Sequence, residues 1–557
     1  MPTDPSDARR RRAAFDWHPE PELLDVLDAD TSRAALERLG EETWRTALDY
    51  LYGEALRRAM GEPAGYADLR ARYFGERGAP GPAPATPATT SAILEEFRAR
   101  LSPHQLNSWH PRAFSYFTPP PLVASIAGEV LAQWTNQGVD VWHAGPSATF
   151  VEEEVVRWLC DLVGYGEGSF GLLTSGGVMA NFVAMALVRD VHLARLTGAT
   201  RPPRGRTLEG VRVYTGDQTH FSIGRALDEL GFPPETLVTL PTDERFRLHA
   251  DPVRAAIVED RAAGLLPVAL TAVAGSTNTG SVDDIHALAA VAEAEGLWFH
   301  VDAAYGGAAL LSARDAARVP ALGRADSVTV DPHKWFFQAY DIGGLLVREG
   351  DRLAATFGRR LPEYYRGGEA PVRPLTDSTE DGHGEDGHGE DGHDAPGQLN
   401  FWKLGFEGTR RWRALKLWFS WKHLGTEGFG RLVERNNDLA AYLAQRVRAS
   451  DDFEALPDEP ELSVVCFRHL PKGRRATSER SLGPHVLDAH QDRLATALEA
   501  SGDGWLSTTR LRGATWLRAG ILNYMSEPAD VDRLLEHLRE LAARRDSRGM
   551  ESRAGRT

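Results

Sequence analysis

The sequence has 557 residues, of which 79 are acidic and 63 are lysine or arginine, so its formal net charge is −16. This negative charge argues against nucleic acid as a partner, and no apolar run approaches the roughly 20 residues that span a bilayer. The two cysteines, Cys160 and Cys466, lie far apart in apolar stretches, which predicts reduced core residues and no disulfide framework. We therefore expect a large cytoplasmic protein of two or three domains without membrane contact.

Residues 1–90 are predicted to form an N-terminal helical segment that ends in a linker. Residues 1–20 have a composition typical of disorder. Helical periodicity with tryptophan and leucine then extends over 22–75. The proline- and alanine-rich stretch 78–90 is typical of a linker between folded parts.

Residues 91–425 are predicted to form a large domain. Its first part, 93–164, should be mostly helical, with three tryptophans on or near buried faces, Trp134, Trp142 and Trp158. From about 170 to 347, apolar strands alternate with helical stretches. This alternation predicts an α/β fold with a doubly wound, mostly parallel sheet, because parallel strands are joined by crossover helices.

Lys334 is the first lysine of a chain whose positive charge comes almost entirely from arginine. It follows an apolar, β-branched run in the segment 327–335, Ser-Val-Thr-Val-Asp-Pro-His-Lys-Trp. A desolvated lysine has a lowered pKa and forms a Schiff base with an aldehyde, whereas arginine stays protonated. Lys334 is therefore a candidate anchor for pyridoxal phosphate. The alternative is a surface lysine that follows a buried strand.

A second apolar strand ends at Asp302, 32 residues before this lysine, in the run His-Val-Asp-Ala-Ala-Tyr-Gly-Gly. In open α/β sheets, ligands bind at the carboxyl ends of the strands. A buried carboxylate needs a cationic partner, and a protonated pyridine nitrogen supplies one while it makes the ring a better electron sink. Without such a partner, Asp302 would be an ordinary cap at the end of a strand.

Two further strand ends complete an ordered series. In the segment 170–181 a strand breaks at Gly176 and Gly177 and restarts as a helix, whose first backbone N–H groups suit a phosphate. Tight turns also use glycine for conformational reasons alone. In the segment 211–222 a strand leads to His220, whose flat ring can stack on a pyridine, hold a carboxylate or relay a proton. A structural histidine is the alternative there.

The motifs Thr-Ser-Gly-Gly, Asp-Gln-x-His-x-Ser, His-Val-Asp-Ala-Ala-Tyr and Pro-His-Lys-Trp, in this order, resemble the group II pyridoxal-phosphate-dependent amino-acid decarboxylases, the family of aromatic-L-amino-acid decarboxylase. The likeness extends over about 90–545, with one large interruption, and includes patches at 110–117, 410–418 and 517–523. It implies fold type I of the pyridoxal-phosphate enzymes and a homodimer with its site at the subunit interface. We expect a smaller C-terminal α/β domain over 426–545 and a disordered tail over 546–557.

The resemblance assigns roles to the residues that match its motifs. Lys334 would hold the cofactor as a Schiff base, Asp302 would pair with the pyridine nitrogen, and His220 would stack on the ring. The other contacts would come from Gly177, Val178 and His333 at the phosphate, Thr277 near further polar groups and Ala304 beneath the ring. Val178 departs from relatives that often have a hydroxyl residue there, so one side-chain contact to the phosphate is lost.

The implied reaction is decarboxylation of an L-amino acid to an amine and carbon dioxide. In the family, a tyrosine on a loop beyond the lysine returns a proton to Cα; Tyr364 aligns with it, and Tyr365 is an adjacent candidate. Two adjacent tyrosines also make an ordinary packing pair. Related aldehyde synthases carry phenylalanine at that place, so Tyr364 favours simple decarboxylation. In relatives the position of Tyr116 and Phe117 lines the substrate pocket, and this pair favours an aromatic substrate.

Other reactions on the same fold are alternatives: an aminotransferase, an aldehyde synthase, or a decarboxylase for glutamate or diaminobutyrate. The helix start at 409–411, Thr-Arg-Arg, resembles the diaminobutyrate type. Residues 371–397 form an acidic insertion with a repeated Glu-Asp-Gly-His motif, for which we predict a disordered loop. Its three histidines could bind a divalent metal weakly in a protein without catalytic activity. Nothing in the repeat fixes a coordination geometry, so we predict no metal site.

Overall fold

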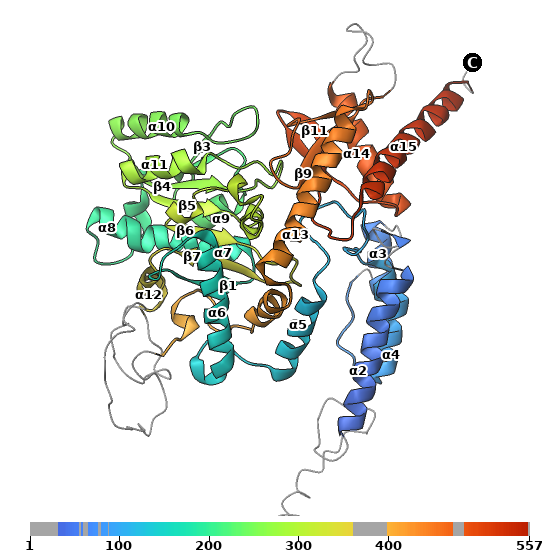
Figure 1. Cartoon of the computed structure of the whole chain (residues 1–557), viewed down its shortest axis with the longest axis horizontal. Helices are drawn as coiled ribbons and strands as arrows, with labels where there is room; N and C mark the ends of the chain where they lie inside the picture. The colour runs from blue at the N-terminus through green and yellow to red at the C-terminus, as the bar shows by residue number, and fades with distance from the viewer. Residues whose placement is uncertain are drawn as a thin grey trace, which may run out of the picture. The chain divides into compact units, whose positions relative to one another are not determined.

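The computed structural model describes residues 32–54, 57–58, 65–75, 79–86, 88–359, 398–471 and 484–554 (Figure 1). The chain divides into two compact units, one within Met1–Ala113 and Thr496–Trp505 and the other within Phe114–Ala495 and Leu506–Thr557. Tyr364, Tyr365 and the insertion 371–397 lie outside the described residues, as do residues 1–31.

The first unit is mainly helical and extends beyond residue 90, where we placed the start of the large domain. Its helices are α2 (Ser32–Asp49), which continues into the π-helical turn η1 (Tyr50–Glu54), α3 (Tyr66–Phe74), and α4 (Thr90–Glu96), which continues into η4 (Phe97–Leu101) and η5 (Ser102–His104). The side chain of Thr89 caps α4 by accepting the N–H of Ala92. Residues 105–122, which span the boundary between the units, contain no helix, but most of 93–164 is helical, as predicted.

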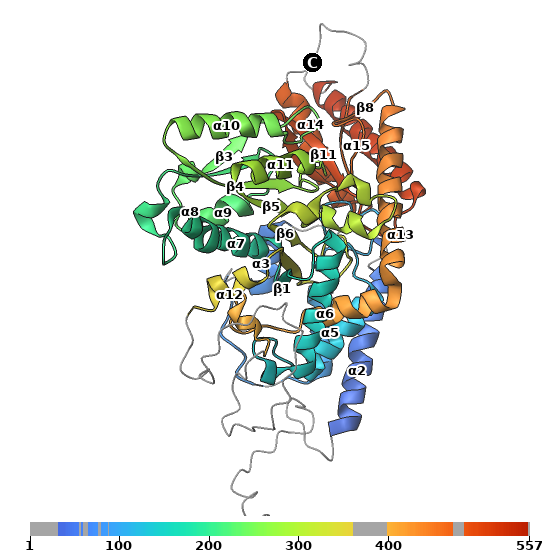
Figure 2. The ribbon, with the colours of Figure 1, turned by 60° about the vertical axis from the view of Figure 1, so that its left-hand side comes forward.

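A seven-stranded sheet forms the centre of the second unit (Figure 2). Its strand order is β1-β7-β6-β5-β4-β2-β3, and all neighbours are parallel except that β7 is antiparallel to both β1 and β6. The doubly wound, mostly parallel α/β fold is therefore confirmed. The strands are β1 (Phe170–Thr174), β2 (Val211–Gly216), β3 (Leu237–Leu240), β4 (Leu266–Val273), β5 (Trp298–Asp302), β6 (Ser327–Val330) and β7 (Gly343–Val347).

Helices cover both faces of this sheet because each crossover between parallel strands carries one. In Figures 1 and 2, α10 and α11 lie on one side of the sheet and α7 and α9 on the other. The stretch Gly177–Thr197 is long and apolar enough to cross a membrane, but most of it is buried inside the protein, as in the core helix of a globular protein. The helices are α5 (Val123–Thr135), α6 (Pro146–Val163), α7 (Gly177–Leu187) with η7 (Val188–Leu193) and α8 (Ala194–Thr197), α9 (Ser222–Glu229), α10 (Ala250–Ala262), α11 (Ile285–Glu295) and α12 (Asp351–Phe357).

One tryptophan differs from the prediction. Trp134 is 59% exposed, because α5 buries only its small residues Ser125, Gly128 and Ala132.

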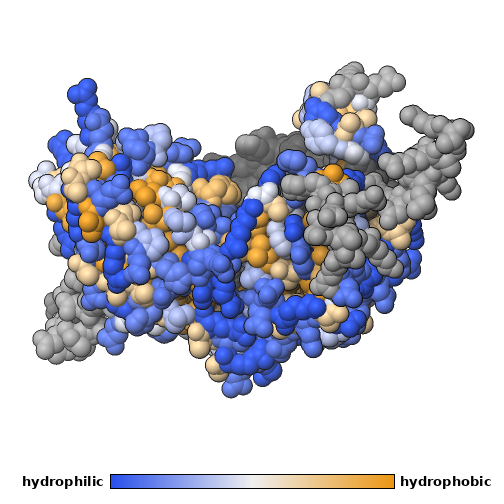
Figure 3. Space-filling model, turned by 90° about the horizontal axis from the view of Figure 1, so that it is seen from above, coloured by the Kyte–Doolittle hydropathy of each residue, from blue (hydrophilic) through white to orange (hydrophobic). Residues whose placement is uncertain are grey.

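On the face that Figure 3 shows, hydrophilic residues predominate and apolar ones lie between them in smaller groups. Cys160 and Cys466 are buried and unpaired, as predicted.

A second, antiparallel sheet lies in the C-terminal part of the same unit, with the strand order β10-β11-β9-β8. The long helix α13 (Ala414–Arg448) precedes it and is interrupted at Gly425, whose φ of +63° is left-handed. This interruption falls where we place the start of the smaller domain. The strands are β8 (Phe453–Ala455), β9 (Val464–His469), β10 (Ser507–Leu511) and β11 (Ala514–Gly520).

The last helix is longer than the sequence suggested. Helix α15 (Pro528–Ala554) continues through most of the tail that we predicted to be disordered from residue 546. The tail has many charged residues, which resemble a solvated coil in composition, but arginine and glutamate also have high helix propensity. Helix α14 (Pro484–Ser501) precedes the strand pair β10 and β11.

Candidate active site

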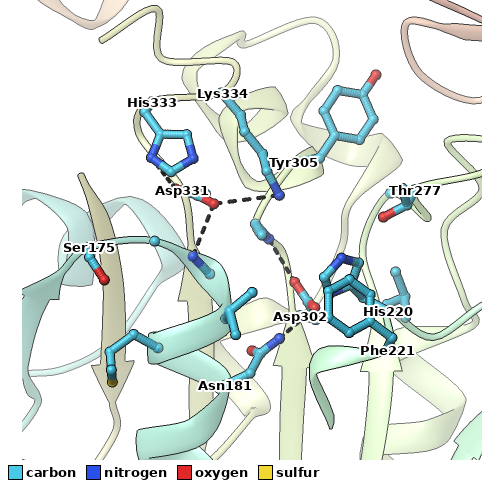
Figure 4. Close-up of a pocket in the computed structure, with 17 residues that line it drawn as sticks. Ser175, Asn181, His220, Phe221, Thr277, Asp302, Tyr305, Asp331, His333 and Lys334 are labelled. Carbon is cyan, nitrogen blue, oxygen red and sulfur yellow. Dashed lines mark hydrogen bonds and ion pairs between the residues drawn. The ribbon is translucent and has the colours of Figure 1, made fainter. Parts of the chain in front are cut away.

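The carboxyl ends of β1, β2, β5 and β6 meet at one cavity of about 360 Å³ (Figure 4). This is the edge at which parallel sheets bind ligands. Eight predicted site residues line the cavity: Gly177, Val178, His220, Thr277, Asp302, Ala304, His333 and Lys334. The structure thus brings together segments that lie far apart in the sequence.

Asp302 is a buried carboxylate, 6% exposed, that is held by neutral donors. Its Oδ2 accepts a hydrogen bond from the amide of Asn181 at 2.8 Å, and its Oδ1 accepts the N–H of Ala304 at 3.1 Å. In the described part of the chain, no lysine or arginine forms an ion pair with it. A buried carboxylate without a cation fits a ligand that brings one, such as a protonated pyridine nitrogen.

His220 is oriented by a short chain of hydrogen bonds. The hydroxyl of Ser222 accepts from the Asn181 amide at 2.8 Å and lies 2.8 Å from Nδ1 of His220. The backbone N–H of Ser222 also donates to Nδ1, at 3.4 Å, so Nδ1 is an acceptor: the hydroxyl proton points to it, and the neutral ring carries its own proton on Nε2. Burial lowers the pKa of His220, and the positive charges of Lys334 and Arg225 lower it further against the opposing effect of Asp302, so the neutral form is favoured.

Asn181 joins these two groups and was missed by the sequence reasoning. Its Oδ1 accepts from the hydroxyl of Thr329 at 2.6 Å and lies 3.1 Å from Nε2 of His300. Burial lowers the pKa of His300 to about 4, so this ring is neutral and donates from Nε2. These contacts fix the amide so that its two N–H bonds face Asp302 and Ser222. A lone polar residue in the otherwise apolar helix α7 was the signal that could have found it.

Asp331 is the second residue that the sequence reasoning passed over. It is buried at the end of β6, and its Oδ2 accepts the N–H of Gly177 at 3.0 Å and lies 3.5 Å from Nζ of Lys334. Its Oδ1 lies 3.0 Å from Nδ1 of His333. Burial raises the pKa of Asp331 to about 7 and lowers that of His333 to about 3. A carboxylate directly after a buried strand is the same signal that identified Asp302.

The predicted substrate residues are placed differently from the cofactor residues. Phe117, which we predicted to line the substrate pocket, does not line this cavity: it is buried and stacks on Tyr305, which does line it, with ring centroids 4.3 Å apart. Nζ of Lys334 lies 5.8 Å from the centroid of the Phe117 ring. Tyr116 does not line the cavity, is 61% exposed and has a φ of +52°. Tyr364, the predicted proton donor, lies outside the described residues.

A buried guanidinium group contacts the ring of Phe117. The side chain of Arg518 lies over the Phe117 ring, 4.6 Å from its centroid, and donates from Nε to the carbonyl of Thr277 at 2.7 Å. No carboxylate pairs with it in the described part of the chain. Burial lowers its pKa, although arginine remains charged at neutral pH.

The fold and the cavity define a class of protein. A lysine amine, a buried carboxylate without a cation and a glycine-led helix start meet at the strand ends of an α/β sheet, and together they fit the aldehyde, ring nitrogen and phosphate of pyridoxal phosphate. The family model described as "Pyridoxal-dependent decarboxylase conserved domain" matches residues 75–367 and 388–470. The chain belongs to this family. It is a pyridoxal-phosphate-dependent carboxy-lyase of fold type I.

Individual relatives agree with this assignment. The aromatic-L-amino-acid decarboxylase of Bacillus atrophaeus is 31% identical over 433 residues, which are 78% of this chain and 81% of that protein. The L-2,4-diaminobutyrate decarboxylase of Rhizobium meliloti (strain 1021) is 30% identical over 465 residues, 83% of this chain and 84% of that protein. The crystal structure of mouse CSAD has a TM-score of 0.79 at 25% identity, and the match covers 92% of this chain and 99% of that structure's chain.

Proposed function

We propose that the protein decarboxylates an aromatic L-amino acid at this cavity. The observation that carries the proposal is the convergence of Lys334, Asp302 and His220 on one cavity at the edge of the sheet. An aromatic substrate is supported by the similarity to the Bacillus enzyme and by the aromatic rings of Phe221 and Tyr305 in the cavity wall. Pocket chemistry, rather than fold, has to discriminate between substrates in this family.

Each residue that we assign to the cofactor site has a proposed part in the reaction. Lys334 anchors the cofactor, Asp302 holds a proton on its ring nitrogen, and the start of α7 at Gly177 binds its phosphate. His220 would stack on the ring, with its proton on Nε2. Pyridoxal phosphate, when bound, supplies an electron sink for the bond that breaks. Tyr364 remains the predicted donor of the proton that replaces the carboxylate.

The diaminobutyrate alternative has one specific support, the similarity to the Rhizobium enzyme. The second support that the sequence suggested, the Thr-Arg-Arg helix start at 409–411, is weaker. Arg410 is buried, pairs with Glu152, and donates to the carbonyls of Leu173 at 2.7 Å and Val139 at 2.9 Å. It therefore braces the end of β1 and is not available to a substrate.

The experiment that tests the function is product identification by mass spectrometry. The purified protein, loaded with pyridoxal phosphate, is incubated separately with each common L-amino acid and with L-2,4-diaminobutyrate. We expect tryptophan, tyrosine or phenylalanine to yield an amine lighter than its parent by one carbon dioxide. Diaminopropane would move the enzyme to the diaminobutyrate type, and an aldehyde or a keto acid would show that Tyr364 is not the donor of a simple decarboxylase.

We further propose that the enzyme is a cytoplasmic homodimer. Helix α5 supports this, because it packs its small residues inward and leaves Val123, Val130, Leu131 and Trp134 exposed. An apolar surface of this kind is typical of protein contacts. Two buried, unpaired cysteines agree with a reducing compartment.

A further inference from the structure

The carboxyl group of Asp331 lies at the place proposed for the phosphate of the cofactor. Its Oδ2 accepts the N–H of Gly177, the first residue of α7, at 3.0 Å. A Cβ atom added to Gly177 would lie only 3.2 Å from that oxygen, so the carboxyl group and the helix start are in close contact. A phosphate that approaches this helix start therefore meets a second acidic group.

The other carboxyl oxygen needs a proton. Oδ1 of Asp331 is buried and receives no hydrogen bond from the residues that the structure describes, and Nδ1 of His333 lies 3.0 Å from it. That nitrogen already accepts the N–H of Ile342 at 3.3 Å. Two acceptors that face each other repel, whereas a protonated carboxyl group would donate to the histidine or to a bound phosphate.

The groups around Asp331 act in opposite directions on its charge. Lys334, on the same loop, and the amide of Gly177 on α7 favour the carboxylate, whereas Asp302 on β5 and burial disfavour it. Nearby His333 is neutral because of burial and of the positive charges on Lys334 and Lys416. Once Lys334 is joined to the cofactor, it no longer offers Asp331 a free ammonium group. The phosphate adds negative charge on the other side, so both changes favour a neutral carboxyl group.

We propose that Asp331 takes up a proton when the cofactor binds, and that the neutral carboxyl group then positions the phosphate as a hydrogen-bond donor. The inference rests on the proposed place of the phosphate at Gly177. In the free protein, the pKa of Asp331 is raised by burial to about 7, so the group is mostly ionised above neutral pH and has a proton to gain. Cofactor affinity should therefore decrease as the pH rises above 7.

The test is a titration of cofactor-free protein with pyridoxal phosphate and with pyridoxine phosphate, which lacks the aldehyde and cannot react with Lys334. Affinity is measured by tryptophan fluorescence between pH 7 and 9, where a free phosphate with a second pKa of about 6 is already a dianion. We expect the affinity of the unaltered protein for both ligands to decrease, approaching about tenfold per pH unit. Asp331→Asn keeps a donor but cannot ionise, so its profile should be shallower by the contribution of this one proton, and any remaining slope should come from the ligand's own groups.

A matched control is available in Asp283, another buried carboxyl group whose pKa is raised by burial to about 7. It accepts the N–H groups of Leu248 and Val273 at 2.7 Å and does not line the cavity. Asp283→Asn should keep the profile of the unaltered protein. Calorimetry of pyridoxine phosphate binding in two buffers of different ionisation enthalpy should show close to one proton fewer taken up by Asp331→Asn.

Two outcomes would overturn the inference. Parallel profiles for the unaltered protein and Asp331→Asn would show that Asp331 does not change its protonation state. A flat profile for the unaltered protein itself would show that no proton is taken up when the cofactor binds. Amine production by the saturated enzyme tests the proposed function separately, because a proton-linked cofactor site can exist in a protein that forms no amine.

Discussion

The amide of Asn181 contacts both partners that the resemblance assigns to the cofactor ring. One N–H bond goes to Asp302, and the other goes to Ser222, which orients His220. The amide oxygen is held in turn by Thr329 and His300. The orientation of one side chain therefore sets the hydrogen bonding of the carboxylate and the tautomer of the histidine together.

Replacing Ser222 by alanine should allow His220 to carry its proton on either ring nitrogen. The lost hydrogen bond is worth about 1 kcal/mol, so we expect kcat to decrease by roughly fivefold while cofactor affinity changes little. Nitrogen NMR of the labelled protein should show part of His220 with its proton on Nδ1. Ser312→Ala is the control, because the hydroxyl of Ser312 is also buried but bonds to Glu434, away from the cavity. An unchanged His220 spectrum would contradict the hydrogen-bond chain.

Replacing Lys334 by alanine should abolish covalent attachment of the cofactor. The residue that reacts with an aldehyde must be an amine, and Lys334 is the lysine that lines the cavity. After borohydride reduction, the mass of the unaltered protein should increase by one reduced cofactor, and that of the variant should not. Lys422→Ala, which removes a half-exposed lysine paired with Glu154, should behave like the unaltered protein. Cofactor that remains covalently bound to the Lys334→Ala variant would show that Lys334 is not the residue to which the cofactor is attached.

At the scale of elements, helices α5 and α13 hold the loop that carries the lysine. The N–H of Leu122, just before α5, donates to the carbonyl of Phe337 at 2.9 Å, and the N–H of Ala339 donates to the hydroxyl of Ser125 at 3.0 Å. From α13, Nζ of Lys416 donates to the carbonyl of Ala339 at 3.0 Å. A Cβ atom on Gly128 would lie 2.7 Å from Cα of Lys416, so the two helices pack closely.

Replacing Lys416 by methionine should weaken the contact between α13 and the loop that carries Lys334. Its side chain is fully buried, and Nζ lies 2.8 Å from Oε2 of Glu129. Glu129 keeps Arg411 as a second partner, so the cost is that of losing a charged hydrogen-bonded group, about 1.5–3 kcal/mol. We expect a lower free energy of unfolding in urea and faster loss of bound cofactor. Lys422→Met breaks a half-exposed ion pair and should lower the free energy of unfolding by about 1 kcal/mol or less. An equal decrease in both variants would contradict a stabilising role of Lys416 at this loop.

At the scale of the whole molecule, the exposed side of α5 is the surface that we assign to the homodimer. Trp134→Glu places a charge in this apolar surface and should shift the protein towards monomers in sedimentation velocity experiments at micromolar concentration. Val258→Glu is the control, since Val258 is an exposed apolar residue of α10, on the other side of the large sheet from α7 and α9. A variant Trp134→Glu that remains dimeric would move the interface elsewhere.

Much of the large sheet could be predicted from the sequence, because its strands are local patterns. The apolar runs that end at Asp302 and Val330 were recognised as β5 and β6, and the glycine turn before α7 was recognised too. Asn181 and Asp331 were not, since their roles depend on partners more than a hundred residues away, Asp302 and Gly177. Trp134 was misplaced because a helix rich in apolar residues does not reveal which face packs against its neighbour.

The neutral donors around Asp302 give the enzyme a means of choosing between ring systems. A benzene isostere of the cofactor, with the same aldehyde and phosphate but no ring nitrogen, could still reach Lys334 and the start of α7. It would leave the carboxylate of Asp302 buried opposite a C–H bond, at a cost of several kcal/mol unless a proton or a water molecule enters with it. The vitamin-derived pyridine would thus be selected by a buried carboxylate that, among the described residues, has only neutral hydrogen-bond donors.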